Sequence, residues 1–217
     1  WVEPEMISPD SDLYRAHPDW ALHIPGRPNS PSRWQYVLDM SRKDVEDYVF
    51  GRLYDIQSSA QIEYVKWDFN RNLSEVGSAL LPPERQGEVE HRYMLGVYSL
   101  LERVLKAFPG LLLEGCAGGG GRFDAGMLYY APQFWTSDDT DAIERLTIQE
   151  GTSYCYPPSA MSAHVSAVPN HQTGRVTPLK TRGIVAMGGS FGYELDLTKL
   201  SDEEKEEVKQ QVALYHE

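Results

Sequence analysis

The sequence is poor in cysteine, in long apolar runs and in clustered basic residues. Its two cysteines, Cys116 and Cys155, are too few for a disulfide framework, and two free thiols favour a reducing compartment such as the cytoplasm, with the localisation itself left open. There is no run of about 18 apolar residues and no basic segment followed by an apolar stretch, so neither a membrane span nor a signal peptide is predicted. The formal net charge of -12, with Lys and Arg scattered along the chain, excludes nucleic acid as a partner.

The chain does contain enough apolar material for a folded core. Apolar residues make up 41% of its 217 residues and aromatic residues 11%, which is typical of one globular unit. The first residue, Trp1, stands inside the phrase Trp1-Val2-Glu3-Pro4-Glu5-Met6. We interpret this start as the interior of a longer protein, whose missing part could have carried a targeting signal.

Hydrophobic spacing predicts strands that alternate with helices. The first and last helices have capping patterns, Ser41-x-x-Asp44 and Ser201-x-x-Glu204. In chain order the predicted elements are a helix at 41–58, a strand at 62–67, a helix at 89–108, strands at 111–116 and 133–136, a helix at 139–149, strands at 184–187 and 193–195, and a helix after Ser201.

This alternation indicates an α/β fold with a parallel sheet. Asp68, Cys116 and Asp138 follow three different predicted strands, which favours a TIM (β/α)8 barrel, because a doubly wound sheet gathers its site at one switch point. A complete barrel takes about 250 residues and eight strands, and only five or six strands are visible here. We therefore predict one partial barrel domain over residues 1–217, with the early strands missing.

The phrase around Asp68 is the first candidate for chemistry. Lys66, Asp68 and Asn70 alternate along an extended segment and so share one side. A nucleophilic carboxylate must be ionised, and a neighbouring ammonium group favours that form. The spacing alone favours an ordinary surface ion pair between Lys66 and Asp68.

The segment from Gly115 to Asp124 has five glycines among its first seven residues. It is not a phosphate-binding loop, since no Gly-Lys-Ser/Thr follows, GxGxxG is not met and no helix begins directly after the glycines. A tight structural turn and a loop that lies against a sugar ring are equally compatible with the pattern.

The segment from Trp135 to Asp141 is the third candidate. A capped helix start explains Ser137, Asp139 and Asp141, which leaves Asp138 available as a general acid. His164 and His171 fit no spacing of metal ligands, so no metal site is predicted.

Five phrases in this order resemble the α-galactosidases of glycoside hydrolase family 36, nearly from end to end. They are Trp1 to Met6, Tyr64-Val65-Lys66-Trp67-Asp68, Gly115 to Asp124, Trp135 to Asp141, and Pro169-Asn170-His171-Gln172-Thr173-Gly174-Arg175. The resemblance implies a TIM-barrel catalytic domain that is normally preceded by a β-sandwich domain and followed by a small β domain.

The resemblance also implies roles for residues. Asp68 would be the nucleophile and Asp138 the acid/base. The expected substrate-binding residues are Trp1, Arg33, Lys66, Trp67, Asn70, Cys116, Gly118 and Gly119. Ala117 and Asp139 depart from the family, which often has Ser and Asn there, and this puts substrate preference rather than reaction class in question.

The implied function is hydrolysis of terminal α-linked galactose with retention of configuration, on melibiose- or raffinose-type oligosaccharides and without a cofactor. Retention predicts that the Asp68 and Asp138 carboxyl groups lie about 5–5.5 Å apart. The alternatives are a galactosyl transferase of the raffinose- or stachyose-forming kind and a truncated sugar-binding barrel without turnover. The full-length enzyme is expected to be a homo-oligomer.

Overall fold

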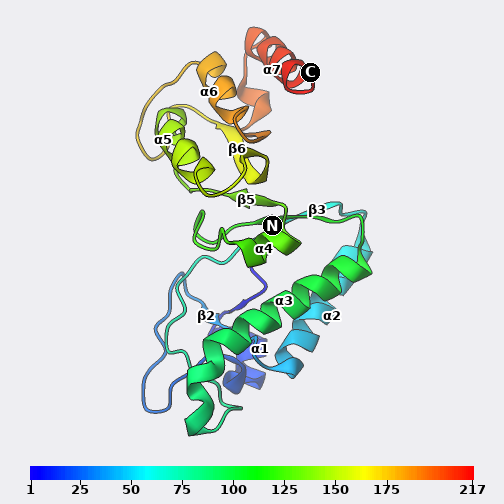
Figure 1. Ribbon diagram of the computed structural model, residues 1–217, viewed down its shortest axis with the longest axis vertical. Coiled ribbons are helices and arrows are strands. Elements are labelled where there is room, and N and C mark those ends of the chain that lie inside the picture. Colours follow the sequence, from blue (N-terminus) through cyan, green and yellow to red (C-terminus); the bar gives the residue numbers. More distant parts are fainter. The chain divides into compact units, whose positions relative to one another are not determined.

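The computed structural model describes all residues from Trp1 to Glu217. The chain divides into two compact units, Trp1–Leu113 and Glu114–Glu217. In Figure 1 the first unit runs from blue to green and the second from green to red. None of the helices combines the length and the apolar character needed to cross a membrane.

The first unit is built on a pair of long helices. Helix α2 (Lys43–Ser59) packs against α3 (Val89–Ala107), and strand β3 (Tyr64–Trp67) lies between them in the chain. The smaller elements are β1 (Met6–Ile7), α1 (Asp12–Ala16), the 3-10 helix η1 (Pro18–Trp20), β2 (Tyr36–Val37) and the 3-10 helix η2 (Pro83–Glu88). β1 and β2 pair in the antiparallel direction.

Helix α3 buries the apolar stripe that its sequence predicts. Its buried side chains are Val89, Tyr93, Val97, Leu100, Leu101 and Val104. The helix also comes very close to the chain before α2, because a Cβ atom added to Gly96 would lie 1.7 Å from the carbonyl oxygen of Met40. Only glycine allows this approach.

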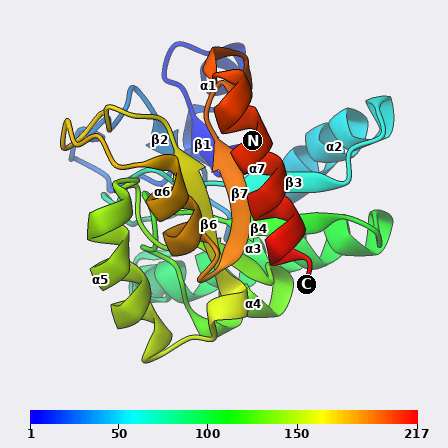
Figure 2. The ribbon, with the colours of Figure 1, turned by 90° about the horizontal axis from the view of Figure 1, so that it is seen from above.

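The second unit contains parallel strands that alternate with helices. Its elements are β4 (Leu112–Gly115), which begins in the first unit, α4 (Ala125–Tyr130), β5 (Gln133–Trp135), α5 (Ala142–Ser153), the 3-10 helix η3 (Pro158–Ala160), β6 (Met161–Ser166), α6 (Leu179–Ala186), β7 (Ser190–Glu194), the 3-10 helix η4 (Leu197–Lys199) and α7 (Asp202–Tyr215). Strands β4, β5, β6 and β7 pair in that order. Figure 2 shows α5, α6 and α7 in succession alongside β6 and β7.

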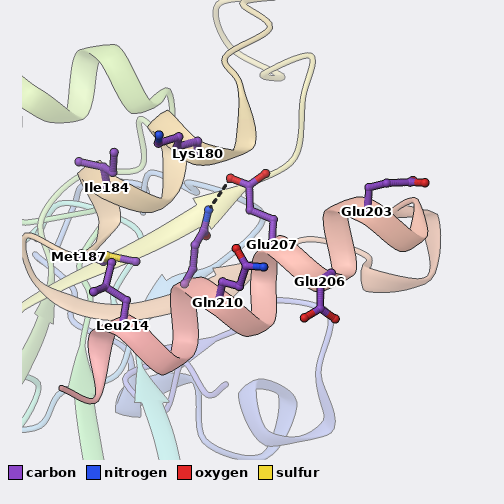
Figure 3. A pocket seen from close by; sticks show the side chains of 9 residues that line it. Lys180, Ile184, Met187, Glu203, Glu206, Glu207, Gln210 and Leu214 are labelled. Carbon is purple, nitrogen blue, oxygen red and sulfur yellow. Dashed lines mark hydrogen bonds between the residues drawn. The ribbon is translucent and has the colours of Figure 1, made fainter.

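A buried amide on helix α7, that of Gln211, bonds this helix to α6 and β7. Gln211 donates to the carbonyl oxygen of Leu179 at 3.2 Å and accepts from the Tyr193 hydroxyl at 2.6 Å. Between α6 and α7 lies a groove of about 660 Å³ (Figure 3). Its lining side chains are Lys180, Ile184, Met187, Glu203, Glu206, Glu207, Gln210, Gln211 and Leu214. None of the predicted site residues is among them.

Most predicted elements are confirmed, and one is wrong. Residues 184–187 were expected to form a strand, but 184–186 end helix α6. Pro178 stands directly before the first turn of α6, where a helix tolerates its missing N–H, and a short apolar run fits a helix as well as a strand. The patterns do not predict β6, because its Ser, Ala and His residues have little β propensity; pairing with β5 and β7 decides it.

Two helices begin at other residues than predicted, and in both cases an aspartate carboxylate is the reason. Ser41 does not cap α2, since its hydroxyl donates to Asp39 at 2.5 Å and α2 begins at Lys43. Helix α5 begins at Ala142 rather than at 139, because Asp141 accepts from the first free N–H groups, and the helix continues past Gly151 to Ser153. The capping box of Ser201 and Glu204 is confirmed at the start of α7.

The α/β class is therefore confirmed by parallel strands that alternate with helices. A complete eight-stranded barrel, and a single barrel domain over residues 1–217, stay predictions.

A buried carboxylate fastens the N-terminal segment inside the first unit. Glu5 is fully buried, and one of its oxygens accepts from the Trp67 indole N–H at 2.9 Å while the other accepts from the Tyr93 hydroxyl. These bonds join the segment before β1 to β3 and α3. A buried carboxylate is tolerated only when its oxygens are paired in this way.

We expect Glu5→Ala to destabilise the protein. Each donor left without an acceptor, on Trp67 and on Tyr93, costs about 1–3 kcal/mol. The thermal unfolding midpoint should fall by about 2–4 °C for each kcal/mol. Glu5→Gln should cost less, because its amide can accept from Trp67 and donate to the Tyr93 oxygen. The exposed Glu84 supplies the control, Glu84→Ala; an equal midpoint for both alanine variants contradicts the argument.

Candidate active site

The first unit places Asp68 at the end of β3, beside the N-terminal segment. Val2 and Trp67 form a parallel bridge, in which the Val2 N–H donates to the Lys66 carbonyl and the Asp68 N–H donates to the Val2 carbonyl, both at 2.9 Å. Alternate residues share a face. Trp1 and Glu3 therefore lie on the same face as Lys66 and Asp68.

Three N–H donors surround the Asp68 carboxylate. Its Oδ2 accepts from the Trp1 indole at 3.0 Å and from the Asn70 amide at 2.7 Å, and its Oδ1 accepts from the Phe69 backbone N–H at 2.8 Å. The residue is 1% exposed. The Lys66 ammonium lies 5.1 Å from the centre of the Trp1 ring. A negative charge in this position is well compensated, and its orientation is fixed.

The Glu3 carboxylate accepts hydrogen bonds from three side chains. It accepts from Gln35 at 3.0 Å, from Arg33 at 3.2 Å and from the amide of Asn70. Asn70 therefore donates to two carboxylates, those of Glu3 and Asp68. Through these contacts Arg33, one of the predicted sugar-binding residues, is connected to the predicted nucleophile.

Arg33 is presented by a strained hairpin turn. Ser32 and Gln35 exchange backbone hydrogen bonds, and the two residues between them, Arg33 and Trp34, have φ values of 51° and 61°. This left-handed region costs a residue with a side chain about 1–2 kcal/mol. The ion pair between Arg33 and Glu3 helps to hold the turn in place.

Trp67 lies on the opposite face of β3 from Asp68. It is 1% exposed, and its indole N–H donates to Glu5. Its predicted contact with sugar stays a prediction, as do the sugar contacts of Trp1, Arg33, Lys66 and Asn70.

The second unit places Asp138 shortly after β5, with its side chain exposed. The Trp135 indole N–H donates to the Asp138 carboxylate at 3.2 Å. The Trp135 ring in turn stacks on the His164 ring, with centroids 4.7 Å apart, and the Arg145 guanidinium lies 4.5 Å from its centroid. His164 Nδ1 lies 3.3 Å from Glu194.

Arg145 is the buried support of this region. Its guanidinium donates to the carbonyl oxygens of Ser137 at 3.0 Å and Ser162 at 2.8 Å. Burial lowers the pKa of Arg145 to about 10, so that it stays charged at neutral pH. It thereby ties the backbone next to Asp138 to strand β6.

The segment of residues 169–175 forms hydrogen bonds with the residues that follow Asp138. Asn170 donates to the Thr140 hydroxyl at 3.0 Å, and the Thr140 N–H donates to Gln172 at 3.1 Å. Asp141 accepts from Thr173 and Arg175, both at 2.5 Å. Burial opposes ionisation of Asp141, but these donors and the helix N–H groups outweigh it and lower its pKa. The Asp138 segment is thus anchored on its C-terminal side.

The glycine-rich loop packs against the same segment. Gly119 has φ of +84°, and a Cβ atom added to it would lie 2.8 Å from Ser137 Cα and 2.9 Å from the Asp138 nitrogen. Gly118 has φ of +56°, and a Cβ atom added to it would have no other atom within 4 Å. Cys116, at the start of the loop, is buried, whereas Cys155 is exposed, and the two cysteines form no disulfide. The loop is therefore a tight turn; a sugar contact by Cys116, Gly118 or Gly119 stays a prediction.

The family resemblance singled out the two aspartates, but neither it nor the residue patterns pointed to the side chains that hold them. Glu3 could have been found, because it alternates with Trp1 in one extended phrase. Arg145 and His164 had no such signal, since their contacts with Trp135 come from α5 and β6. Asp68 and Asp138 belong to different units, so the separation of their carboxyl groups stays a prediction.

Known proteins match the chain over its whole length. The profile of the family named Melibiase matches residues 1–217. α-Galactosidase AgaA of Geobacillus stearothermophilus is 64% identical over 215 residues, which are 99% of this chain and 30% of the relative. α-Galactosidase 1 of Pediococcus pentosaceus is 59% identical over 215 residues, 99% of this chain and 29% of the relative.

Solved structures of proteins in the same family also resemble this chain. A crystal structure of an AgaA variant in complex with raffinose has a TM-score of 0.97 at 63% identity and covers 100% of this chain and 30% of that chain. A second AgaA variant, in complex with stachyose, gives the same values. The chain thus spans about 30% of the length of these relatives. Since the family profile covers every residue, this chain belongs to the melibiase family, the α-galactosidases of glycoside hydrolase family 36.

Proposed function

We propose that the full-length protein is a retaining α-galactosidase in which Asp68 is the nucleophile and Asp138 the general acid and base. The observation that carries the proposal is the buried Asp68 carboxylate, held by three N–H donors in a chain of this family. Relatives that are named α-galactosidases align with 99% of this chain at 64% and 59% identity, which supports the proposal.

In the first step an Asp68 oxygen bonds to the anomeric carbon of galactose while the bond from that carbon to the leaving oxygen breaks. Asp138 gives its proton to the leaving oxygen. The donors from Trp1, Asn70 and Phe69 hold the Asp68 carboxylate in one orientation before the attack.

In the second step Asp138 takes a proton from water, whose oxygen bonds to the anomeric carbon as the bond to Asp68 breaks. Two inversions release galactose with its original configuration. The exposed position of Asp138 supports this role, since the group must give up and regain a proton in each cycle.

The proposed substrates are galacto-oligosaccharides of the raffinose type, on the basis of the relatives bound to raffinose and stachyose. The proposed sugar contacts are Trp1, Arg33, Lys66, Trp67, Asn70, Cys116, Gly118 and Gly119. The proposal includes a (β/α)8 barrel in the full-length protein, with its catalytic groups after the carboxyl ends of strands.

The nucleophile can be tested by removing its side chain. Asp68→Gly in the full-length protein should abolish hydrolysis of an aryl α-galactoside, and added azide should restore turnover, because the small anion fits the space of the lost carboxylate. The product should be β-galactosyl azide, identified by NMR, since only one inversion has occurred. An α-configured azide, or wild-type hydrolysis by the variant, excludes Asp68 as the nucleophile.

The acid can be tested with two leaving groups. Asp138→Ala should reduce turnover of melibiose by about 100- to 10,000-fold, the usual contribution of general acid catalysis. The loss with an aryl galactoside that has a good leaving group should be much smaller, because that oxygen needs little protonation. The measurement is the turnover of both substrates by steady-state kinetics, for the variant and for the wild type. Equal losses would assign Asp138 to binding or folding.

The glycine loop can be tested by its contact with the Asp138 backbone. Gly119→Ala should reduce activity on melibiose by about 100-fold, the cost of a displacement near 1 Å at a catalytic group, because the new Cβ meets Ser137 and Asp138. Gly26 has φ of +81° and nothing within 4 Å, so Gly26→Ala carries the same backbone strain without that contact. Similar activity in the two variants would contradict the steric argument.

A further inference from the structure

Asn70 lies between two carboxylates, and this fixes how its amide is turned. Its Nδ2 donates to Asp68 Oδ2 at 2.7 Å and also to Glu3 Oε1. An asparagine side chain has two N–H donors on its nitrogen and only an acceptor on its oxygen. Because both neighbours are acceptors, only the amide orientation with nitrogen toward them satisfies both.

Glu3 is itself held in one position. Its side chain is 18% exposed, and besides Asn70 it binds the Arg33 guanidinium at 3.2 Å and the Gln35 amide at 3.0 Å. Arg33 reaches Glu3 from the strained turn at Arg33 and Trp34. Pairing of Val2 with β3 places Glu3 beside Asp68 along the same face. The carboxylate of Glu3 is therefore a fixed acceptor and not a mobile surface group.

We propose that Glu3 is a positioning residue for the nucleophile: it turns the Asn70 amide so that its nitrogen donates to Asp68. Glu3 would not touch the reacting atoms. Its effect passes through Asn70, and the contacts from Arg33 and Gln35 keep Glu3 in place. This inference rests on the proposed role of Asp68.

The first test compares two substitutions of Glu3 in the full-length protein. Glu3→Ala should lower kcat/KM by about 10- to 100-fold, the effect of losing one hydrogen bond to a charged group. The loss should be the same for melibiose and for an aryl galactoside, because the nucleophile serves both leaving groups. Glu3→Gln should recover most of the activity, since its carbonyl oxygen can still accept from Asn70. Glu63, an exposed residue just before β3, supplies the control Glu63→Ala, with wild-type kinetics expected.

The second test asks whether Glu3 acts through Asn70. If it does, the double variant Glu3→Ala with Asn70→Ala should be no slower than Asn70→Ala alone, because residues in one network are not additive. Independent losses that multiply in the double variant would contradict the proposal.

The third test separates positioning from a structural role. In the Asp68→Gly background the nucleophile is azide, so adding Glu3→Ala should lower the azide-dependent rate by much less than the roughly 10- to 100-fold expected with Asp68 in place. A small loss remains there, because Glu3 also holds Arg33 and Asn70, which are proposed sugar contacts. An equal fold loss in both backgrounds would mean a general disturbance of the site and would overturn the proposal. If wild-type protein is inactive on α-galactosides, or azide yields no β-galactosyl azide, the proposed function fails first. If both results are as expected and Glu3→Ala equals wild type, only the role of Glu3 is wrong.

Discussion

The buried carboxylate of Glu5 is the interaction on which the arrangement of the first unit depends. Its two oxygens are bonded to Trp67 of β3 and Tyr93 of α3, so the N-terminal segment cannot slide without leaving a charge unpaired in the core. That constraint keeps Val2 in register with Trp67. A shift by one residue would turn Trp1 and Glu3 away from Asp68, because alternate residues of an extended chain face opposite sides. The surroundings of the proposed nucleophile are thus set by a contact on the other side of the strand.

The two proposed catalytic carboxyl groups have contrasting surroundings, and the contrast agrees with their proposed roles. Asp68 is 1% exposed and bonded to three N–H groups, which suits a group that must stay ionised and oriented for attack. Asp138 is exposed and bonded to the indole of Trp135, which suits a group that exchanges a proton in each cycle. Charge compensation governs the first site, and backbone placement governs the second.

The second unit fixes Asp138 through packing rather than through direct bonds to many donors. Trp135 is in contact with His164 and Arg145, the glycine-rich loop touches the backbone at Ser137, and residues 169–175 hold the helix start that follows. Segments that are far apart in the sequence, the glycine-rich loop and residues 169–175, therefore both support the backbone around Asp138. The glycine-rich loop is a tight turn against a neighbouring segment, and its contact with sugar stays a prediction.

A structural feature could be predicted from the sequence when the residues that form it lie close together in the chain. The long amphipathic helices, the strand before Asp68 and the capping box at Ser201 depend on neighbours within a few residues, so their patterns predict them. The identity of the two aspartates came from phrases that resemble a family rather than from spacing, which by itself favoured a surface ion pair. Only the tertiary structure decided that residues 184–186 are helical, that the small-residue segment at 161–166 is a strand, and that Glu3, Arg145 and His164 support the site. Each of these depends on pairing or contact between residues distant in the chain, which no local pattern encodes.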